Sequence, residues 1–220
     1  MREITWWKGQ NPFCESLYWQ QGQNLIHISG IFERSVPSFL KNTSSGWVKI
    51  EYNLLPGSTS LRFDRERKGA SGRTLEIERF LSRVTRSLFL LDKISDQTLR
   101  IDCDILVADG STRTTCLNAI CLLILLLEKK LHKTFLKESF CGISAGIDSS
   151  KNILSDLNFE EDSVKSLIDF SFALTSSSKI IEIQGCAEKE PLDMEIFMKV
   201  FEEMKKSSLP IFEVYHQAMQ

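Results

Sequence analysis

Five segments have the apolar, β-branched and aromatic character that is typical of strands. Turn residues such as Gly, Pro and Ser separate them. We expect strands at residues 25–32, 47–55, 99–107, 140–147 and 179–185.

The segment LRIDCDILVAD shows the clearest alternation. Its apolar side comprises Leu99, Ile101, Cys103, Ile105 and Val107, and its polar side Arg100, Asp102 and Asp104. Successive side chains of a strand point to opposite faces, so we predict a half-buried strand.

Three other segments have helical patterns. From Thr74 on, apolar residues recur every three or four positions: Leu75, Ile77, Leu81, Val84, Leu88 and Leu91. After Gly110 the apolar run is shorter than the roughly 20 residues that cross a bilayer, and Asn118 interrupts it, so we predict a core helix and no membrane association. A last helix is expected from Pro191, with one face formed by Ile196, Phe197, Val200, Phe201 and Met204 and with Lys205 and Lys206 in its last turn.

Strands and helices thus mix along the chain, without a linker or a low-complexity tract. The pattern predicts an α+β fold of mixed sheets packed with helices, as a single domain over residues 1–220. Met1–Gln20 lacks the basic start and apolar core of a secretory signal, which favours a cytoplasmic protein. Six scattered cysteines, without zinc-finger spacing, favour buried thiols over disulfides or a structural metal.

Charge is distributed unevenly. The formal net charge is −2, yet residues 61–86 hold eight basic and four acidic residues. A basic segment in an acidic chain indicates either an anion or phosphate-backbone site or a helix with solvated arginines.

Two predicted helix starts combine a glycine, a hydroxyl and an arginine. In Asp109-Gly110-Ser111-Thr112-Arg113, free backbone N–H groups and Arg113 would favour an anion. For Ser111, Thr112 and Thr114 taken alone, helix capping is the favoured explanation over phosphate binding, but it does not explain Arg113. Arg73, in GASGRT, repeats the pattern, and both arginines would contact one phosphate if the helices lay side by side.

Two pairs of carboxylates are candidates for metal binding. Asp102 and Asp104 share a strand face, which suits either a metal-dependent nucleotidyltransferase or plain solvation. Asp156 and Asp162 are six residues apart, roughly 20 Å in an extended chain, and would meet only if the chain bends near Glu160 and Glu161.

Five ordered segments resemble bacterial ribonuclease PH between about Val36 and Pro191. They are EYNLLPGST, GRTLEIERFLSRVTRS, IDCDILVADGSTRT, DLNFEEDS and IIEIQGCAEKEP. Polynucleotide phosphorylases and exosome ring subunits are related to that family.

The resemblance implies the ribonuclease PH-like fold, of βαβα type, and a phosphate-dependent 3′ to 5′ exoribonuclease, or tRNA nucleotidyltransferase. Such enzymes take part in tRNA and rRNA processing, trim RNA 3′ ends with inorganic phosphate as co-substrate, and release nucleoside diphosphates. It also implies a homohexameric ring, a trimer of dimers.

Position by position, the resemblance assigns phosphate binding to Arg73, Gly110, Ser111, Thr112 and Arg113. It assigns catalysis and Mg²⁺ binding to Asp156 and Asp162, and RNA binding to Arg62 and Arg65.

The sequence departs from the family at Gly57, Asp64 and Ser111, and residues 1–20 diverge most. A non-catalytic RNA-binding or ring-scaffold subunit on the same fold is therefore the alternative to an active exoribonuclease.

Overall fold

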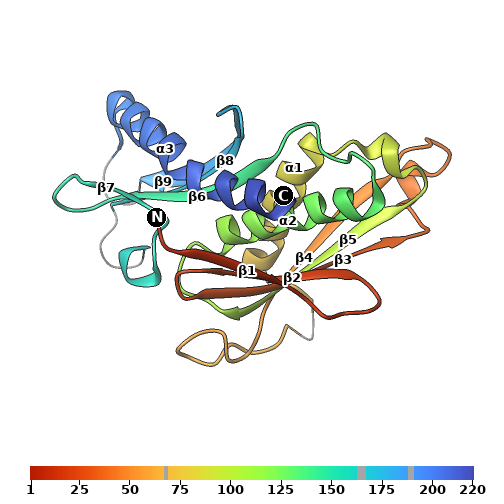
Figure 1. The fold of residues 1–220 in the computed structure, drawn as a ribbon. Coiled ribbons are helices and arrows are strands. Elements are labelled where there is room, and N and C mark those ends of the chain that lie inside the picture. Colours follow the sequence, from red (N-terminus) through yellow and green to blue (C-terminus); the bar gives the residue numbers. More distant parts are fainter. Residues whose placement is uncertain (67–68, 163–166, 188–190) are drawn as a thin grey trace.

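The computed structural model describes residues 1–66, 69–162, 167–187 and 191–220 (Figure 1). Arg67 and Lys68 of the basic segment lie outside these residues, as do Ser163 of DLNFEEDS and residues 188–190 of the last family segment.

The first sheet takes up most of the N-terminal half of the chain. Its strands are β1 (Ile4–Lys8), β2 (Glu15–Gln21), β3 (Asn24–Glu33), β5 (Thr98–Val107) and β4 (Trp47–Leu54), in that spatial order. Strands β4 and β5 are parallel, and helix α1 (Gly72–Leu88) lies between them in the chain; the other pairings are antiparallel.

The second sheet is antiparallel and is built from the C-terminal half. Its order is β7 (Ile153–Ser155), β6 (Phe140–Ile147), β8 (Ile168–Thr175) and β9 (Ile180–Ala187). Helix α3 (Met194–Met219) packs on this sheet, mainly against β6.

Helix α2 (Thr112–Leu131) lies between the two sheets (Figure 1). It contacts β2 and β3 of the first sheet and β6 and β8 of the second. Apolar residues surround most of its circumference, as expected for a helix buried on all sides. In the described part of the chain, no helix is both long and apolar enough to cross a membrane.

Asn118, the polar residue inside this apolar helix, is fully buried and satisfied. Its Nδ2 donates to Gln21 Oε1 at 3.2 Å, and its Oδ1 accepts from the Gly142 N–H at 2.7 Å. Its carbonyl accepts from the Tyr215 hydroxyl at 3.0 Å. Because buried polar groups require partners, Asn118 fixes α2 relative to both sheets and to α3.

The predicted α+β class is confirmed, and each of the five predicted strands is present as β3, β4, β5, β6 or β9. Strands β1, β2, β7 and β8 were not predicted. Four of the six cysteines are fully buried, but Cys14 is partly exposed and Cys186 exposed.

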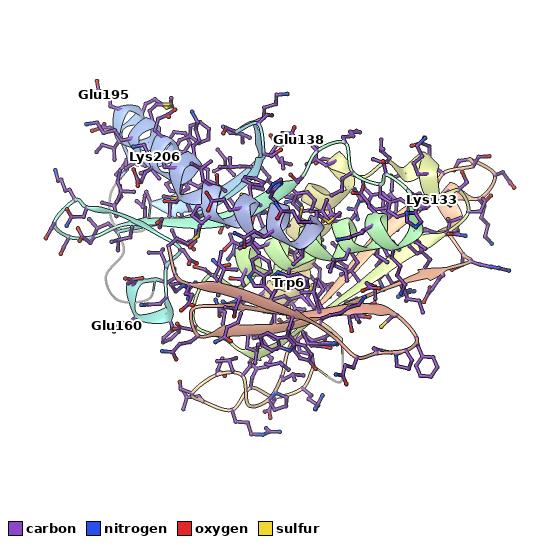
Figure 2. All side chains as sticks on the ribbon, viewed as in Figure 1. Trp6, Lys133, Glu138, Glu160, Glu195 and Lys206 are labelled. Carbon is purple, nitrogen blue, oxygen red and sulfur yellow. The ribbon has the colours of Figure 1, made fainter. Side chains whose placement is uncertain are left out.

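Several boundaries and faces differ from expectation. Helix α1 ends at Leu88, and Leu91 starts a 3₁₀ helix (Leu91–Ile94), while Leu75 and Val107 are 39% and 40% exposed. Helix α3 begins at Met194 rather than at Pro191. Because α3 continues to Met219, Lys205 and Lys206 lie near its middle. Figure 2 labels Lys206 on this helix.

Candidate functional site

The two predicted helix starts meet at one cavity of about 390 Å³. The N-terminal turns of α1 and α2 line it together with residues from β4, β6, β8 and the loops nearby. The lining includes Tyr52, Phe63, Arg73, Gly110, Ser111, Thr112, Arg113, Ser144, Phe159, Asp162, Asp169 and Ser171.

The loop before α2 makes a tight approach to a distant part of the chain. Gly110 has a φ of +68°, and a Cβ there would lie 2.5 Å from the carbonyl carbon of Asn158. Because glycine tolerates positive φ and lacks a Cβ, it lets the 109–113 loop lie directly against residues 157–159.

Ser111 also has a left-handed backbone, with φ of +54°. As the N-cap residue of α2 its side chain makes no capping hydrogen bond. Its hydroxyl instead contacts Ser144 Oγ at 2.5 Å and the carbonyl of Leu157 at 2.6 Å. The capping role considered for this serine is therefore wrong, and its hydroxyl links α2 to β6 and to the 157–159 segment.

Both predicted arginines line the cavity. Arg113, 24% exposed, donates to Gln184 Oε1 at 3.3 Å and lies 3.9 Å from Glu76 Oε1. Arg73 is exposed at the second residue of α1. Together with the N-terminus of α2, they give the cavity a positive field that suits an anion.

A carboxylate already stabilises the start of α1. Glu66 accepts from the Ser71 N–H at 3.0 Å and from the Thr74 hydroxyl at 2.9 Å. The pKa of Glu66 is lowered, mainly by hydrogen bonding to Ser71, although burial opposes this shift. The first turn of α1 thus holds a negative group, whereas no acidic residue lies in the first turn of α2.

Tyr52 closes the apolar side of the cavity. Its side chain is buried, and its hydroxyl lies 2.9 Å from Thr112 Oγ1. Burial raises the pKa of Tyr52 well above its ordinary value. The phenol is neutral near pH 7 with or without this shift, and it is a hydrogen-bond partner of Thr112.

Asp162 lines the cavity and Asp156 does not. The chain bends at Asp156 itself, which has a φ of +57°, and then forms a helical turn from Phe159 to Asp162. Asn158 and Glu161 cap this turn reciprocally, with N···O distances of 2.8 and 3.0 Å.

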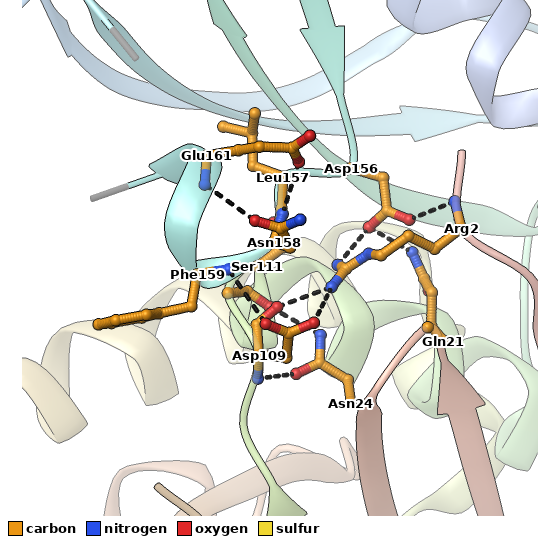
Figure 3. Close-up of polar contacts among 12 residues, drawn as sticks. Arg2, Gln21, Asn24, Asp109, Ser111, Asp156, Leu157, Asn158, Phe159 and Glu161 are labelled. Carbon is orange, nitrogen blue, oxygen red and sulfur yellow. Dashed lines mark hydrogen bonds and ion pairs between the residues drawn. The ribbon is translucent and has the colours of Figure 1, made fainter. Parts of the chain in front are cut away.

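Asp156 is 2% exposed and paired with Arg2 (Figure 3). Its Oδ1 accepts from Arg2 Nη2 at 2.6 Å and from Gln21 Nε2 at 2.8 Å. Its Oδ2 accepts from the Arg2 backbone N–H at 3.0 Å.

The predicted Mg²⁺ site does not fit this arrangement. A metal shared by Asp156 and Asp162 would have to displace Arg2, a cation, from Asp156. The described residues contain no cluster of three or more His, Cys, Asp or Glu side chains that suits a metal ion. The carboxylates at the cavity are Asp162 and, not foreseen from the sequence, Asp169.

The other candidates lie outside this cavity. Arg62 pairs with the exposed Asp64 in the loop between β4 and α1, and Arg65 lines a neighbouring hollow of about 380 Å³. Asp104 lines that hollow too, whereas Asp102 is half-buried on the same face of β5, where burial, Glu51 and Asp104 raise its pKa. Neither aspartate lines the cavity of Arg73 and Arg113.

Sequence reasoning missed residues whose role depends on long-range contacts. Gln184 lies in the quoted IIEIQG segment, but only the fold shows that it contacts Arg113. Ser144 on β6 and, two residues apart on β8, Asp169 and Ser171 line the cavity. No local pattern distinguishes them.

The ribonuclease PH sequence model, described as domain 1 of the 3′ exoribonuclease family, matches residues 16–125, half of the chain. The chain belongs to the ribonuclease PH family. This match includes Arg73 and the 110–113 loop, and ends before Asp156 and Asp162.

Two solved structures extend the ribonuclease PH likeness to the whole fold. Rrp46 of rice (Oryza sativa) has a TM-score of 0.83 at 16% identity, covering 100% of this chain and 95% of that one. The Archaeoglobus fulgidus exosome with RNA bound to its active site has a TM-score of 0.78 at 15% identity, covering 97% and 88%. At such identities the match establishes the fold.

Proposed function

We propose that this chain is a phosphate-dependent 3′ to 5′ exoribonuclease that trims RNA 3′ ends, including those of tRNA precursors, and releases nucleoside diphosphates. The observation that supports it most is the meeting of Arg73, Arg113 and the α2 N-terminus at one cavity with Asp162. Membership of the ribonuclease PH family and the resemblance of the DGSTRT loop to that family's phosphate loop also support this proposal.

In this proposal inorganic phosphate binds against Arg113, Arg73 and the N–H groups at the start of α2. Phosphorolysis brings one anion against another, so the barrier includes strong repulsion, which these fixed positive groups reduce. A phosphate oxygen attacks the last phosphodiester phosphorus, and the bond to the preceding 3′ oxygen breaks. The products are a nucleoside diphosphate and an RNA shortened by one residue.

The leaving 3′ oxygen requires a proton as its bond to phosphorus breaks. We assign its delivery to Asp162, the predicted catalytic carboxylate that lines the cavity. The predicted catalytic role of Asp156 is replaced in this proposal by an indirect one, because both of its oxygens are already hydrogen-bonded.

The RNA strand would reach the cavity past Phe63 and Phe159, which lie on its wall. Exposed aromatic rings stack on bases without selecting a sequence, and Phe159 is 62% exposed. Arg62 and Arg65, in the loop that also contains Phe63, are proposed to contact the RNA backbone.

The decisive experiment measures diphosphate release from a tailed tRNA, with and without inorganic phosphate. Native protein should release diphosphates only with phosphate, whereas Arg113→Ala and Asp162→Asn should lose about 100-fold or more in rate. Arg79→Ala is the matched control, because Arg79 is exposed on α1 and does not line the cavity. Release without phosphate, or equal loss in the control, would refute the proposal.

A non-catalytic RNA-binding or ring subunit is the second candidate. The engagement of Asp156 by Arg2 favours it, because a predicted catalytic carboxylate is then neutralised within the fold. Folded protein that binds RNA but releases no diphosphate under any of these conditions would establish it.

We also propose a homohexameric ring. Large apolar side chains remain exposed on several elements, among them Phe13 (85%), Phe39 (66%) and Met194 (72%). Exposed apolar groups favour contact with other protein surfaces. Light scattering should give six times the 25.2 kDa of one chain, and a monomer at micromolar concentration would contradict the proposal.

A further inference from the structure

Arg2 connects two loops that are far apart in the sequence (Figure 3). Its Nη1 donates to the Asp109 carbonyl at 2.7 Å and lies 3.5 Å from Asp109 Oδ2. Its Nη2 donates to Asp156 Oδ1 at 2.6 Å. One guanidinium therefore bridges the residue before Gly110 and the residue at the bend that leads to Asp162.

Further contacts make the two loops one unit. The other Asp109 carboxylate oxygen, Oδ1, accepts from the Phe159 N–H at 3.2 Å. Asn24 contributes from the start of β3: its Oδ1 accepts from the Asp109 N–H at 2.6 Å, and its Nδ2 donates to the Gly110 carbonyl at 2.7 Å. Arg2 thus completes a polar network directly behind the cavity wall.

The guanidinium is shielded from solvent, with 16% of the Arg2 side chain exposed. Asp156 is almost fully buried beside it, so the two charges attract strongly. Removing either partner would leave the other charge uncompensated, which is destabilising. Arg2 itself does not line the cavity. Its effect on chemistry there must pass through the backbone of the two loops.

We propose that Arg2 is a positioning residue for the cavity. It holds the 109–113 loop and the 156–162 segment in fixed positions relative to each other. This inference rests on the proposed function for its kinetic consequence, but not for its structural one. A planar fork that donates in two directions suits the task, whereas lysine offers one point charge and cannot reproduce both bridges.

The structural test is amide hydrogen exchange of the full chain. In Arg2→Gln and Arg2→Lys, exchange should rise in residues 109–113 and in 156–162 together, with other segments unchanged. The matched control is Arg100→Gln. Arg100, on β5 of the first sheet, also bridges two carboxylates, Glu33 at 2.6 Å and Glu51 at 3.3 Å. None of these three residues lines the cavity.

The kinetic test is phosphate dependence of diphosphate release at a temperature where every variant is folded. Arg2→Gln should raise the phosphate KM about tenfold, because small displacements of positioned groups have large effects on reaction. Arg2→Lys should recover part of that loss, with a phosphate KM between those of Arg2→Gln and native protein, since a cation remains beside Asp156. Arg100→Gln should match native protein in both constants.

The results separate the two proposals. If native protein releases no diphosphate, the proposed activity fails, and the exchange data alone decide the role of Arg2. If exchange rises everywhere, or in neither loop, or in one loop only, or if an active enzyme keeps its native phosphate KM in Arg2→Gln, the positioning role is refuted.

Discussion

Ser111 lies at a left-handed backbone position that favours glycine, and its hydroxyl compensates for the strain. We predict that Ser111→Ala destabilises the protein by about 1–2 kcal/mol, because both hydrogen bonds are lost while the strained backbone remains. Ser111→Gly loses the same bonds but relieves about 1 kcal/mol of left-handed strain. Its free energy of unfolding should therefore lie between those of Ser111→Ala and native protein.

Urea unfolding at pH 7 measures this order directly. Thr59→Ala is a suitable control, since its hydroxyl makes a local contact with the Leu61 carbonyl at the surface. If Ser111→Gly were less stable than Ser111→Ala, the hydroxyl could not be compensating for backbone strain.

Individual site residues were predictable where function depends on a local motif. Arg73, Arg113 and the 110–112 loop follow from glycine, hydroxyl and arginine at a helix start. Asp109 and Arg2 could not be found in this way, because their role depends on contacts over 107 and 154 residues of sequence. Similarly, the spacing of Asp156 and Asp162 does not show that one is buried and the other lines the cavity.

At the scale of elements, Glu15 links strand β2 to helix α2. Its carboxylate is 2% exposed and pairs with Lys130 at 2.8 Å and Lys8 at 3.1 Å. Burial alone raises the pKa of Glu15, but hydrogen bonds from Lys130 and Lys8 outweigh burial, and the pKa is lowered from 4.5.

A depressed pKa in the folded state means that ionised Glu15 adds stability above its unfolded pKa, and that this stability is lost as pH falls through the lower folded value. We predict that Glu15→Gln lowers the free energy of unfolding at pH 7 by about 1.5–3 kcal/mol, as for other hydrogen bonds to charged groups. The difference should shrink below pH 4.5. Urea titrations from pH 3 to 7 test this, and a constant difference would contradict it.

Strand β6 and helix α2 pack closely at Gly142. A Cβ there would lie 2.8 Å from the Thr114 carbonyl oxygen and 2.9 Å from its Cα, both backbone atoms of the α2 start. Gly142→Ala should therefore cost about 1–3 kcal/mol, as overpacked substitutions do. Gly57→Ala is its control, because a Cβ at Gly57 meets nothing within 4 Å. Thermal unfolding followed by circular dichroism compares the two, and an equal effect would contradict the packing argument.

The strands that sequence reasoning found either alternate apolar and polar residues, as β5 does, or form an apolar run, as β6 does. Strand β8 was missed although Asp169 and Ser171 alternate with apolar residues along it, and these two polar side chains line the cavity. Strand β2 was missed because the polar Gln21 is buried as a partner of Asn118 and Asp156. Both failures occur where polar side chains point inward to build or support the site.

For the whole molecule, charge distribution limits how RNA could bind in the proposed function. The chain carries a net charge of −2, so an RNA strand meets no general attraction. The loop with Arg62 and Arg65 lies between β4 and α1 (Figure 1), within the basic segment. Arg62 is 68% exposed, and Asp64, one of the departures from the family, pairs with it. Binding should therefore depend on few phosphate contacts and on displacing Asp64.

The salt dependence of RNA affinity measures the number of those phosphate contacts. Each phosphate neutralised on single-stranded RNA contributes about 0.7 to the slope of log K against log salt. We predict that Arg62→Ala combined with Arg65→Ala reduces the slope by about 1.4. Lys205→Ala with Lys206→Ala removes two cations from the middle of α3 (Figure 2), where each pairs with a glutamate one turn earlier. This control should leave the slope unchanged. Fluorescence anisotropy of labelled RNA over a range of KCl concentrations measures both, and an equal fall in the two double variants would show that RNA senses only total charge.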